Sequence, residues 1–237
     1  DFDGVRLWAI GQAVAVQSLL DTLTDPARGR DGLFPELVLF DCHACHHPMS
    51  DKRWQPRQGV GPGRIRLNDS NLIMLRNIVK VVSPSDSVAF NAQILKVHRA
   101  IAGESVDDPL AEARKLSKLV DRQISFFAKR RFSTDDIRAL LRNLIDEGVS
   151  DGYTDYAGAE QAYMAISSVG SYLQKSGGLS VESSRQLNLR LTAMQKILGN
   201  DENYVPATFR NELLKLRTLV GSTADSKAGN SNPTPRA

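Results

Sequence analysis

Apolar residues recur at spacings of three and four along most of the chain, which is the pattern of helices with one buried face. In the first half this pattern predicts helices over residues 4–24, 68–82 and 85–102. In the second half five apolar stripes share the spacing: Leu116, Val120, Ile124 and Phe127; Ile137, Leu141 and Leu144; Ala159, Ala162, Ile166, Val169 and Leu173; Leu187, Leu191, Met194 and Leu198; and Phe209, Leu213, Leu216 and Val220. No segment shows the alternation of a half-buried strand. We therefore predict an all-α fold in which helices pack against helices.

Polar segments divide this pattern. Residues 103–109 are polar and acidic and end in proline, so we expect a boundary there, between a helical region over residues 1–103 and a helical bundle over residues 104–220. Residues 33–47 are a short apolar stretch in which a helical turn or two is expected. Residues 221–237 are small and polar, cannot bury enough apolar surface to fold, and are predicted to be disordered.

Short local signals mark where several elements begin and end. Ser133 stands three residues before Asp136, which predicts a helix N-cap with acidic residues in the first turn. Gly177 and Gly199 follow apolar stripes, at positions where helices commonly end. Residues 50–66 are rich in glycine and proline and are predicted to form a loop.

Composition excludes some classes of function. The 30 basic residues are balanced by 27 acidic ones, and a net charge of +3 is too small to indicate a nucleic-acid-binding protein. The most apolar stretch, residues 7–20, is interrupted by Gln12, Gln17 and Ser18, and it falls short of the roughly 20 apolar residues of a membrane span. The chain begins at Asp1 inside a helical pattern, so we expect a processed or truncated protein with an export signal or further sequence upstream.

The two cysteines of the chain belong to one motif, because residues 42–46 read CHACH. Two thiols at positions i and i+3 of a helical turn can reach both vinyl groups on one edge of a haem, and a histidine directly after them lies under the iron. The C-x-x-C-H spacing is therefore typical of c-type haem attachment. It predicts thioether bonds at Cys42 and Cys45 and an axial ligand at His46, with one covalently attached haem c as the cofactor.

Two other readings of these cysteines are weaker. A C-x-x-C redox disulfide usually accompanies a βαβ pattern, which this sequence lacks. A structural zinc site usually takes a second pair of ligands further along the chain, and here only His98 remains. His47 cannot bind the same iron as His46, because adjacent residues cannot occupy opposite haem faces. It is either a surface or propionate-contacting histidine or a ligand to a second haem nearby.

The block FDCHACHHPMSDKRWQPR, followed by GVGPGR, resembles the last haem-binding segment of multihaem c-type cytochromes akin to the tetrahaem electron carriers of ammonia oxidisers. The shared features are Phe40, Asp41, the doubled histidine His46 and His47, and a downstream Trp54 with a Gly-Pro-rich loop. The resemblance covers about the first 65 residues, but this chain has one attachment motif where the family has several. It implies a C-terminal part of a longer multihaem protein or a relative that has lost haems. It also implies a periplasmic or extracellular location, since such haems are attached outside the bacterial cytoplasm.

The sixth position on the iron has several candidate ligands. His98 shares an apolar helical face with Ile94, Leu95 and Ile101 and could approach the haem from the side opposite His46. Alternatively, it is a core histidine bonded to a backbone carbonyl. The methionines Met74, Met164 and Met194 read first as core residues, His43 and Met49 are tied to the attachment segment, and an open or water-bound iron is a further alternative.

Haem propionates need cations or hydrogen-bond donors, and those nearest the motif in sequence are Arg53, Trp54, Arg57 and Arg64. Trp54 could instead pack on the porphyrin, and all four could belong to an ordinary solvated loop. The run Lys129, Arg130 and Arg131 is read as charge at a helix C-terminus.

The leading hypothesis is that the chain transfers electrons through its haem, with a redox protein or a neighbouring haem as its partner, as part of a larger assembly. A five-coordinate haem enzyme or small-ligand sensor is the alternative. A third hypothesis is an interaction protein whose C-terminal bundle docks a partner.

Overall fold

Eight helices account for most of the residues that the structure describes. The computed structural model describes residues 4–28, 36, 39–41, 64 and 66–225. The helices are α1 Gly4–Thr24, α2 Ser70–Val82, α3 Pro84–Ile101, α4 Pro109–Lys129, α5 Thr134–Val149, α6 Tyr156–Lys175, α7 Val181–Ile197 and α8 Pro206–Asp225. The only extended pairing in this part of the chain is an isolated antiparallel bridge between Phe40 and Leu67. The all-α prediction is confirmed.

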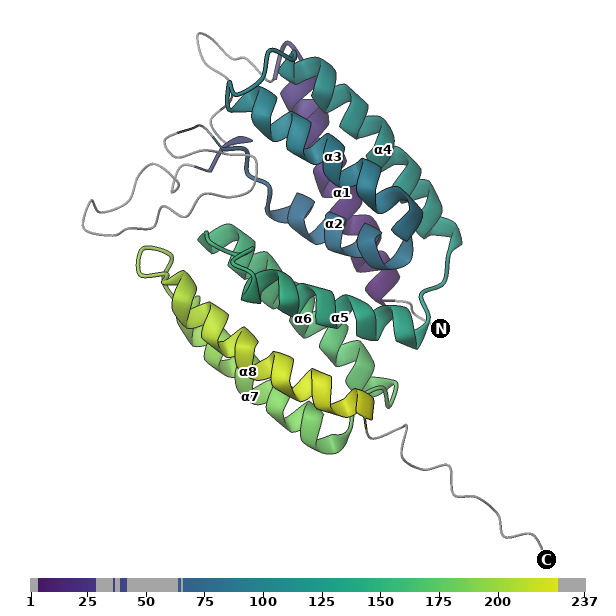
Figure 1. Ribbon diagram of the computed structural model, residues 1–237, viewed down its shortest axis with the longest axis vertical. Coiled ribbons are helices and arrows are strands. Elements are labelled where there is room, and N and C mark those ends of the chain that lie inside the picture. Colours follow the sequence, from purple (N-terminus) through teal and green to yellow (C-terminus); the bar gives the residue numbers. More distant parts are fainter. Residues whose placement is uncertain (1–3, 29–35, 37–38, 42–63, 65, 226–237) are drawn as a thin grey trace, which may run out of the picture.

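The first four helices form one bundle, here called the N-terminal bundle (Figure 1). Helix α1 packs against α2 and α4, and α3 packs against the same two helices, so the four close into a ring of neighbours. Ala9 and Ala13 of α1 and Ala113 of α4 are completely buried. Small side chains on facing helices allow a close approach of the two backbones, which accounts for the long contact between α1 and α4.

The last four helices form a second ring, the C-terminal bundle. Helix α5 packs against α6 and α8, and α7 packs against the same two. The five apolar stripes supply much of the core of both bundles, with Val120, Phe127, Leu141, Ile166 and Leu213 at most 1% exposed. Within the described residues no helix is long and apolar enough to cross a membrane.

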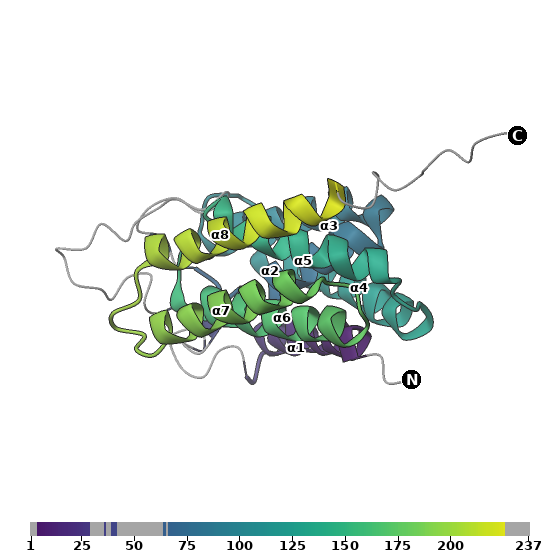
Figure 2. The ribbon, with the colours of Figure 1, turned by 90° about the horizontal axis from the view of Figure 1, so that it is seen from below.

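The two bundles meet through α2, which lies against α5 and α6, and their buried residues form one continuous core (Figures 1 and 2). The boundary expected near residue 103 falls between α3 and α4. These two helices pack against each other within the N-terminal bundle, so the two bundles do not divide there. The division lies instead at residues 130–133, between α4 and α5. There the Arg130 guanidinium donates hydrogen bonds to the Val82 carbonyl at 2.5 Å and to Asp136 at 3.1 Å.

The predicted helix ends agree with the structure. Ser133 caps α5 in a capping box with Asp136, and Gly177 adopts a positive φ of 70° just after α6. Backbone at positive φ favours glycine, so this residue suits the end of the helix. Helix α8 continues to Asp225, into the segment predicted to be disordered, and residues 226–237 lie outside the described part.

Candidate functional site

The chain that leads into the CHACH motif is held by backbone hydrogen bonds. The Asp41 N–H donates to the Arg66 carbonyl at 2.9 Å, and the Asn68 N–H donates to the Leu39 carbonyl at 2.8 Å. These bonds place the segment before Cys42 antiparallel to the segment that enters α2. The site residues predicted next lie outside the described residues: Cys42, His43, Cys45, His46, His47, Met49, Arg53, Trp54 and Arg57.

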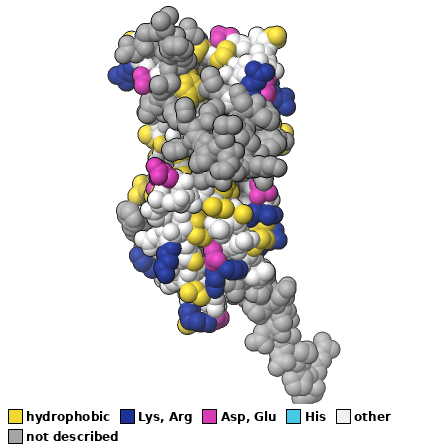
Figure 3. Space-filling view, turned by 90° about the vertical axis from the view of Figure 1, so that its left-hand side faces the viewer, with side chains coloured by type: hydrophobic (Ala, Val, Ile, Leu, Met, Phe, Trp, Pro, Cys, Tyr) yellow, Lys and Arg dark blue, Asp and Glu magenta, His cyan; other side chains and the backbone are white. Residues whose placement is uncertain are grey.

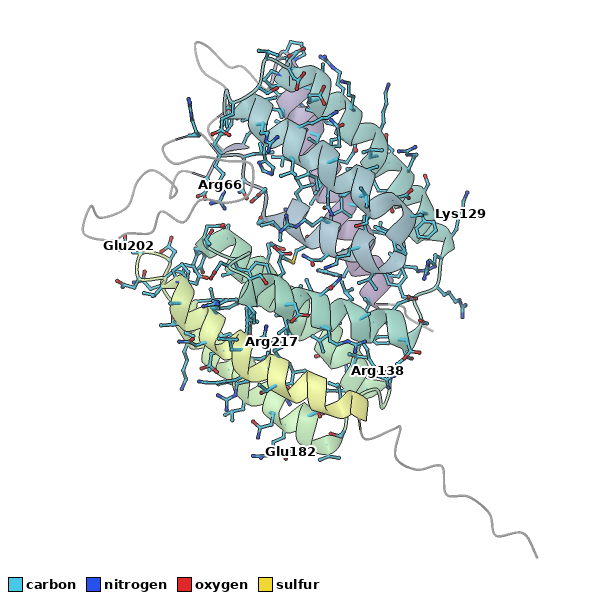
Figure 4. The ribbon with its side chains drawn as sticks, in the orientation of Figure 1. Arg66, Lys129, Arg138, Glu182, Glu202 and Arg217 are labelled. Carbon is cyan, nitrogen blue, oxygen red and sulfur yellow. The ribbon has the colours of Figure 1, made fainter. Side chains whose placement is uncertain are left out.

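One guanidinium connects three parts of the chain at this point. Arg66 lies 3.8 Å from Asp41, 3.8 Å from Asp69 and in direct hydrogen-bonded contact with Asp155. All four side chains are only 10–12% exposed. Asp155 also caps α6 by accepting a hydrogen bond from the Gly158 N–H at 2.6 Å. Arg66 therefore joins the entry to the motif, the start of α2 and the start of α6, where the two bundles face each other (Figure 4).

His98 reaches the same network from α3. Its side chain is buried, and its Nε2 lies 3.4 Å from Oδ2 of Asp69. A backbone carbonyl was the expected partner of a core histidine, and the structure shows a carboxylate beside this one. Asp41 is thus connected to His98 through two side chains, Arg66 and Asp69. The residue next to the first cysteine and the predicted distal ligand belong to one cluster of ionisable side chains.

A cleft of about 640 Å³ opens beside this cluster, between the two bundles. One side is formed by α2 and α3, and the other by the end of α5 and the following residues 150–154. Its lining residues are Arg66, Asp69, Leu72, Ile73, Arg76, Asn77 and Lys80; Ser87, Asn91, Ile94, Leu95 and His98; and Glu147, Ser150, Asp151, Gly152 and Thr154. The volume is that of a small-molecule or cofactor site.

The lining of the cleft is mostly polar. Leu72, Ile73, Ile94 and Leu95 contribute its apolar part, although the first three are only 2–4% exposed, and His98 contributes one imidazole. Among the described residues no group of three or more His, Cys, Asp or Glu side chains is arranged to hold a bare metal ion. A haem iron needs only axial donors, because the porphyrin provides the others.

Other predicted candidates lie elsewhere. Met74 and Met194 are completely buried in the core, as expected of gap-filling residues. Met164 is 42% exposed on α6, so its interpretation as a core residue is wrong. The side chain of Arg64 is 53% exposed and lies 4.0 Å from Glu104, beyond the end of α3.

The basic run at residues 129–131 lies far from the site. Lys129 ends α4 on the side of the molecule opposite Arg66 (Figure 4). Arg130 there joins α2, α4 and α5, as described above, and stacks over Phe126 with its guanidinium carbon 5.6 Å from the ring centre. Its role is structural.

Little in the sequence points to the residues that complete the site. Arg66 and Asp155 are 89 positions apart and meet only in the folded chain. Asp69 directly precedes α2 and would be read as an N-cap, yet it makes no capping hydrogen bond. On the face shown in Figure 3, the described acidic and basic side chains are interspersed and form no patch of one sign.

Comparisons with models of protein families, with characterised proteins and with solved structures return no match to this chain. Its function is therefore inferred from its own residues.

Proposed function

We propose that this chain is a c-type cytochrome that transfers electrons through one haem, attached at Cys42 and Cys45 and ligated by His46 and His98. The observation that carries the proposal is the connection from Asp41 through Arg66 and Asp69 to His98. It ties the residue before the C-x-x-C-H motif to a buried histidine that lines a cofactor-sized cleft. The motif without that histidine would specify attachment but no second axial ligand.

The residues have distinct roles in this proposal. Arg66 holds Asp41, the residue before the attachment motif, close to Asp69 at the start of α2. Asp69 would orient the imidazole of His98 through Nε2, which leaves Nδ1 as the nitrogen that would bind the iron. The haem, when bound, supplies a one-electron couple whose potential depends on its ligands and surroundings. Two histidine ligands suit a carrier, because no coordination site is left open to react.

The wider setting follows from the resemblance to multihaem cytochromes. In that setting His47 is a candidate ligand for a neighbouring haem or a contact for a propionate. The chain works beside a redox partner in a larger assembly, and the protein is exported to the periplasm or beyond. Arg53, Trp54, Arg57 and Arg64 remain candidates for contact with the propionates.

The direct test is covalent haem. The full chain is produced in cells that mature c-type cytochromes, denatured, and examined by haem stain on a gel, intact mass and pyridine haemochrome spectrum. We expect the haem to stay with the polypeptide and add its mass. The matched control is the Cys42→Ala/Cys45→Ala variant, which should lose the covalent haem. An unmodified chain that carries only its polypeptide mass would refute the proposal.

A further inference from the structure

Positive charge is concentrated on helices α3 and α4, which lie side by side at one edge of the molecule (Figure 1). Both helices lie wholly within the described part of the chain, and their exposed ionisable side chains comprise seven cations and two carboxylates. The carboxylates are Asp86 and Asp121. The cations, whose surface is here named the basic face, are Lys96, Arg99, Arg114, Lys115, Lys118, Arg122 and Lys129. Over residues 134–218, by contrast, the exposed charges are balanced, with six cations and seven carboxylates.

Contacts on three sides of α4 leave its fourth side exposed. The first side packs into the core through the apolar stripe described above. On the second side, the Ser117 hydroxyl accepts a hydrogen bond from the side-chain amide of Gln17 in α1 at 2.7 Å. On the third side, the amide of Gln123 donates to the carboxylate of Asp86 in α3 at 2.8 Å. The side chains on the fourth side therefore point into solvent.

This fourth side presents cations at helical spacing. Arg114, Lys118 and Arg122 stand at intervals of four residues, and Lys129 is 15 residues beyond Arg114, a distance of about 22 Å at 1.5 Å per residue. Asp121 is the one exposed carboxylate of α4, all of which the structure describes. Like charges four residues apart on a helix repel one another. An anionic partner along this side of α4 would relieve that repulsion.

The basic face lacks the apolar anchors of a protein interface. Stable protein complexes take much of their affinity from aromatic and apolar side chains buried at the centre of the interface, where lysine is depleted. On α3 and α4, which the structure describes in full, the one large apolar side chain that is exposed is Val88. The cations are instead spread over two neighbouring helices, an arrangement that suits a broad anionic surface.

We infer that the basic face binds the anionic headgroups of a lipid membrane. The negative surface potential of anionic lipids attracts clusters of lysine and arginine, and the attraction extends over about one Debye length. Exposed carboxylates lie between α3 and α4, at one end of the basic face: Glu104, Asp107 and Asp108. The opposite end, with Arg122 and Lys129, therefore approaches the lipid most closely.

Binding in this orientation leaves the candidate site accessible. Lys129 and Arg66 lie on opposite sides of the molecule (Figure 4). A chain held through its basic face therefore presents Arg66 and its partner Asp41 on the side away from the lipid. Membrane binding of this kind does not depend on the haem and goes beyond the proposed function.

Vesicle sedimentation tests the inference with the full chain. The protein is mixed with vesicles of phosphatidylcholine alone, or of phosphatidylcholine and phosphatidylglycerol in equal amounts, and the bound fraction is measured. We expect binding to the mixed vesicles only. Salt at about 1 M should abolish that binding, because the Debye length there falls to about 3 Å.

Two double variants of equal net charge locate the binding surface. Lys118→Gln/Arg122→Gln neutralises two cations of the basic face, and Lys196→Gln/Arg217→Gln neutralises two exposed cations of α7 and α8. Circular dichroism confirms that both are folded. We expect the first variant to bind mixed vesicles at least about fivefold more weakly, and the second to bind like the unmodified chain. Equal loss in both variants, or no binding to mixed vesicles, would overturn the inference. Binding to polyglutamate but not to mixed vesicles would also overturn it and assign the basic face to an acidic protein.

Discussion

The Nε2 atom of His98 lies 3.4 Å from the carboxylate of Asp69, and these side chains are 7% and 10% exposed. Asp69 occupies the N-cap position of α2 without capping it, so its carboxylate faces the imidazole and the Arg66 guanidinium. A carboxylate beside one ring nitrogen fixes the tautomer and orientation of a histidine, which is the support that metal-bound imidazoles commonly have. Because Nε2 is turned to Asp69, the ligand role proposed above falls to Nδ1 of His98.

Replacement of His98 by alanine should change the spin state of the haem. With both histidines bound, the iron is six-coordinate and low-spin. The His98→Ala variant loses one strong ligand, so its absorption spectrum should become high-spin and its ferrous form should bind carbon monoxide. Met74→Leu is the matched control, because it keeps the volume of a completely buried side chain and should leave the spectrum unchanged.

Two results would contradict this assignment. A low-spin spectrum that persists in His98→Ala would eliminate His98 and point to a ligand from outside the described part of the chain. An unmodified protein that is already high-spin and binds carbon monoxide readily would favour a haem enzyme or small-ligand sensor over an electron carrier.

Two arginines two positions apart should differ sharply in their contribution to stability. Arg66→Met leaves three largely buried carboxylates without their shared guanidinium, and breaking such a pair typically costs about 3–5 kcal/mol. Arg64→Met removes an exposed contact at 4.0 Å, which is expected to cost between about 0 and 1 kcal/mol. Urea denaturation of both variants at neutral pH measures the difference. Equal losses would show that the Arg66 network does not stabilise the fold.

The sequence was sufficient to predict where the helices lie along the chain. It was not sufficient to predict which helices pack against one another. Helix α1 was predicted at residues 4–24 and is observed there, because its apolar spacing shows directly which face is buried. The apolar stripe on α4 shows that a face is buried but not which helix covers it. The boundary was therefore placed from the polar, acidic segment at residues 103–109 alone. The contacts of Arg66 escaped prediction for a related reason: its acidic partners come from three separate segments that meet only after folding.

The grouping of α4 with the N-terminal bundle can be tested with two fragments. A fragment from Asp107 to Asp225 contains α4 without α1 and α3, so the face carrying Leu116, Val120 and Phe127 loses its cover. A fragment from Arg131 to Asp225 contains only the C-terminal bundle. We expect the longer fragment to associate more strongly in size-exclusion chromatography with light scattering, since large exposed apolar patches promote association. Both fragments lack α2, which covers α5 and α6 in the whole chain. The two fragments therefore expose the same surface of α5 and α6 and differ only in α4. A longer fragment that is monomeric and melts cooperatively would restore the boundary near residue 103.

The capping box of α5 should give the fold a pH-dependent contribution. Burial raises the pKa of Asp136, but hydrogen bonds from Ser133 and the Arg130 guanidinium outweigh it, and the pKa of this carboxyl lies below its usual value. A depressed pKa in the folded state means that the ionised form stabilises the fold. Its contribution is complete above the ordinary aspartate pKa of about 4 and is lost as the pH falls through the lower folded value.

Asp136→Asn should therefore lower the free energy of unfolding by about 1 kcal/mol at pH 7, the usual worth of such a cap, and the difference from the unmodified protein should shrink below about pH 4. The control is Asp135→Asn: this neighbouring side chain is 91% exposed and pairs only with Arg138 in the same turn, so its loss should change stability little at any pH. Urea denaturation at pH 7, 5 and 3 compares the two variants. A deficit in Asp136→Asn that stays constant down to pH 3 would show that the charge of the carboxyl plays no part, and that only the shape of the side chain supports the start of α5.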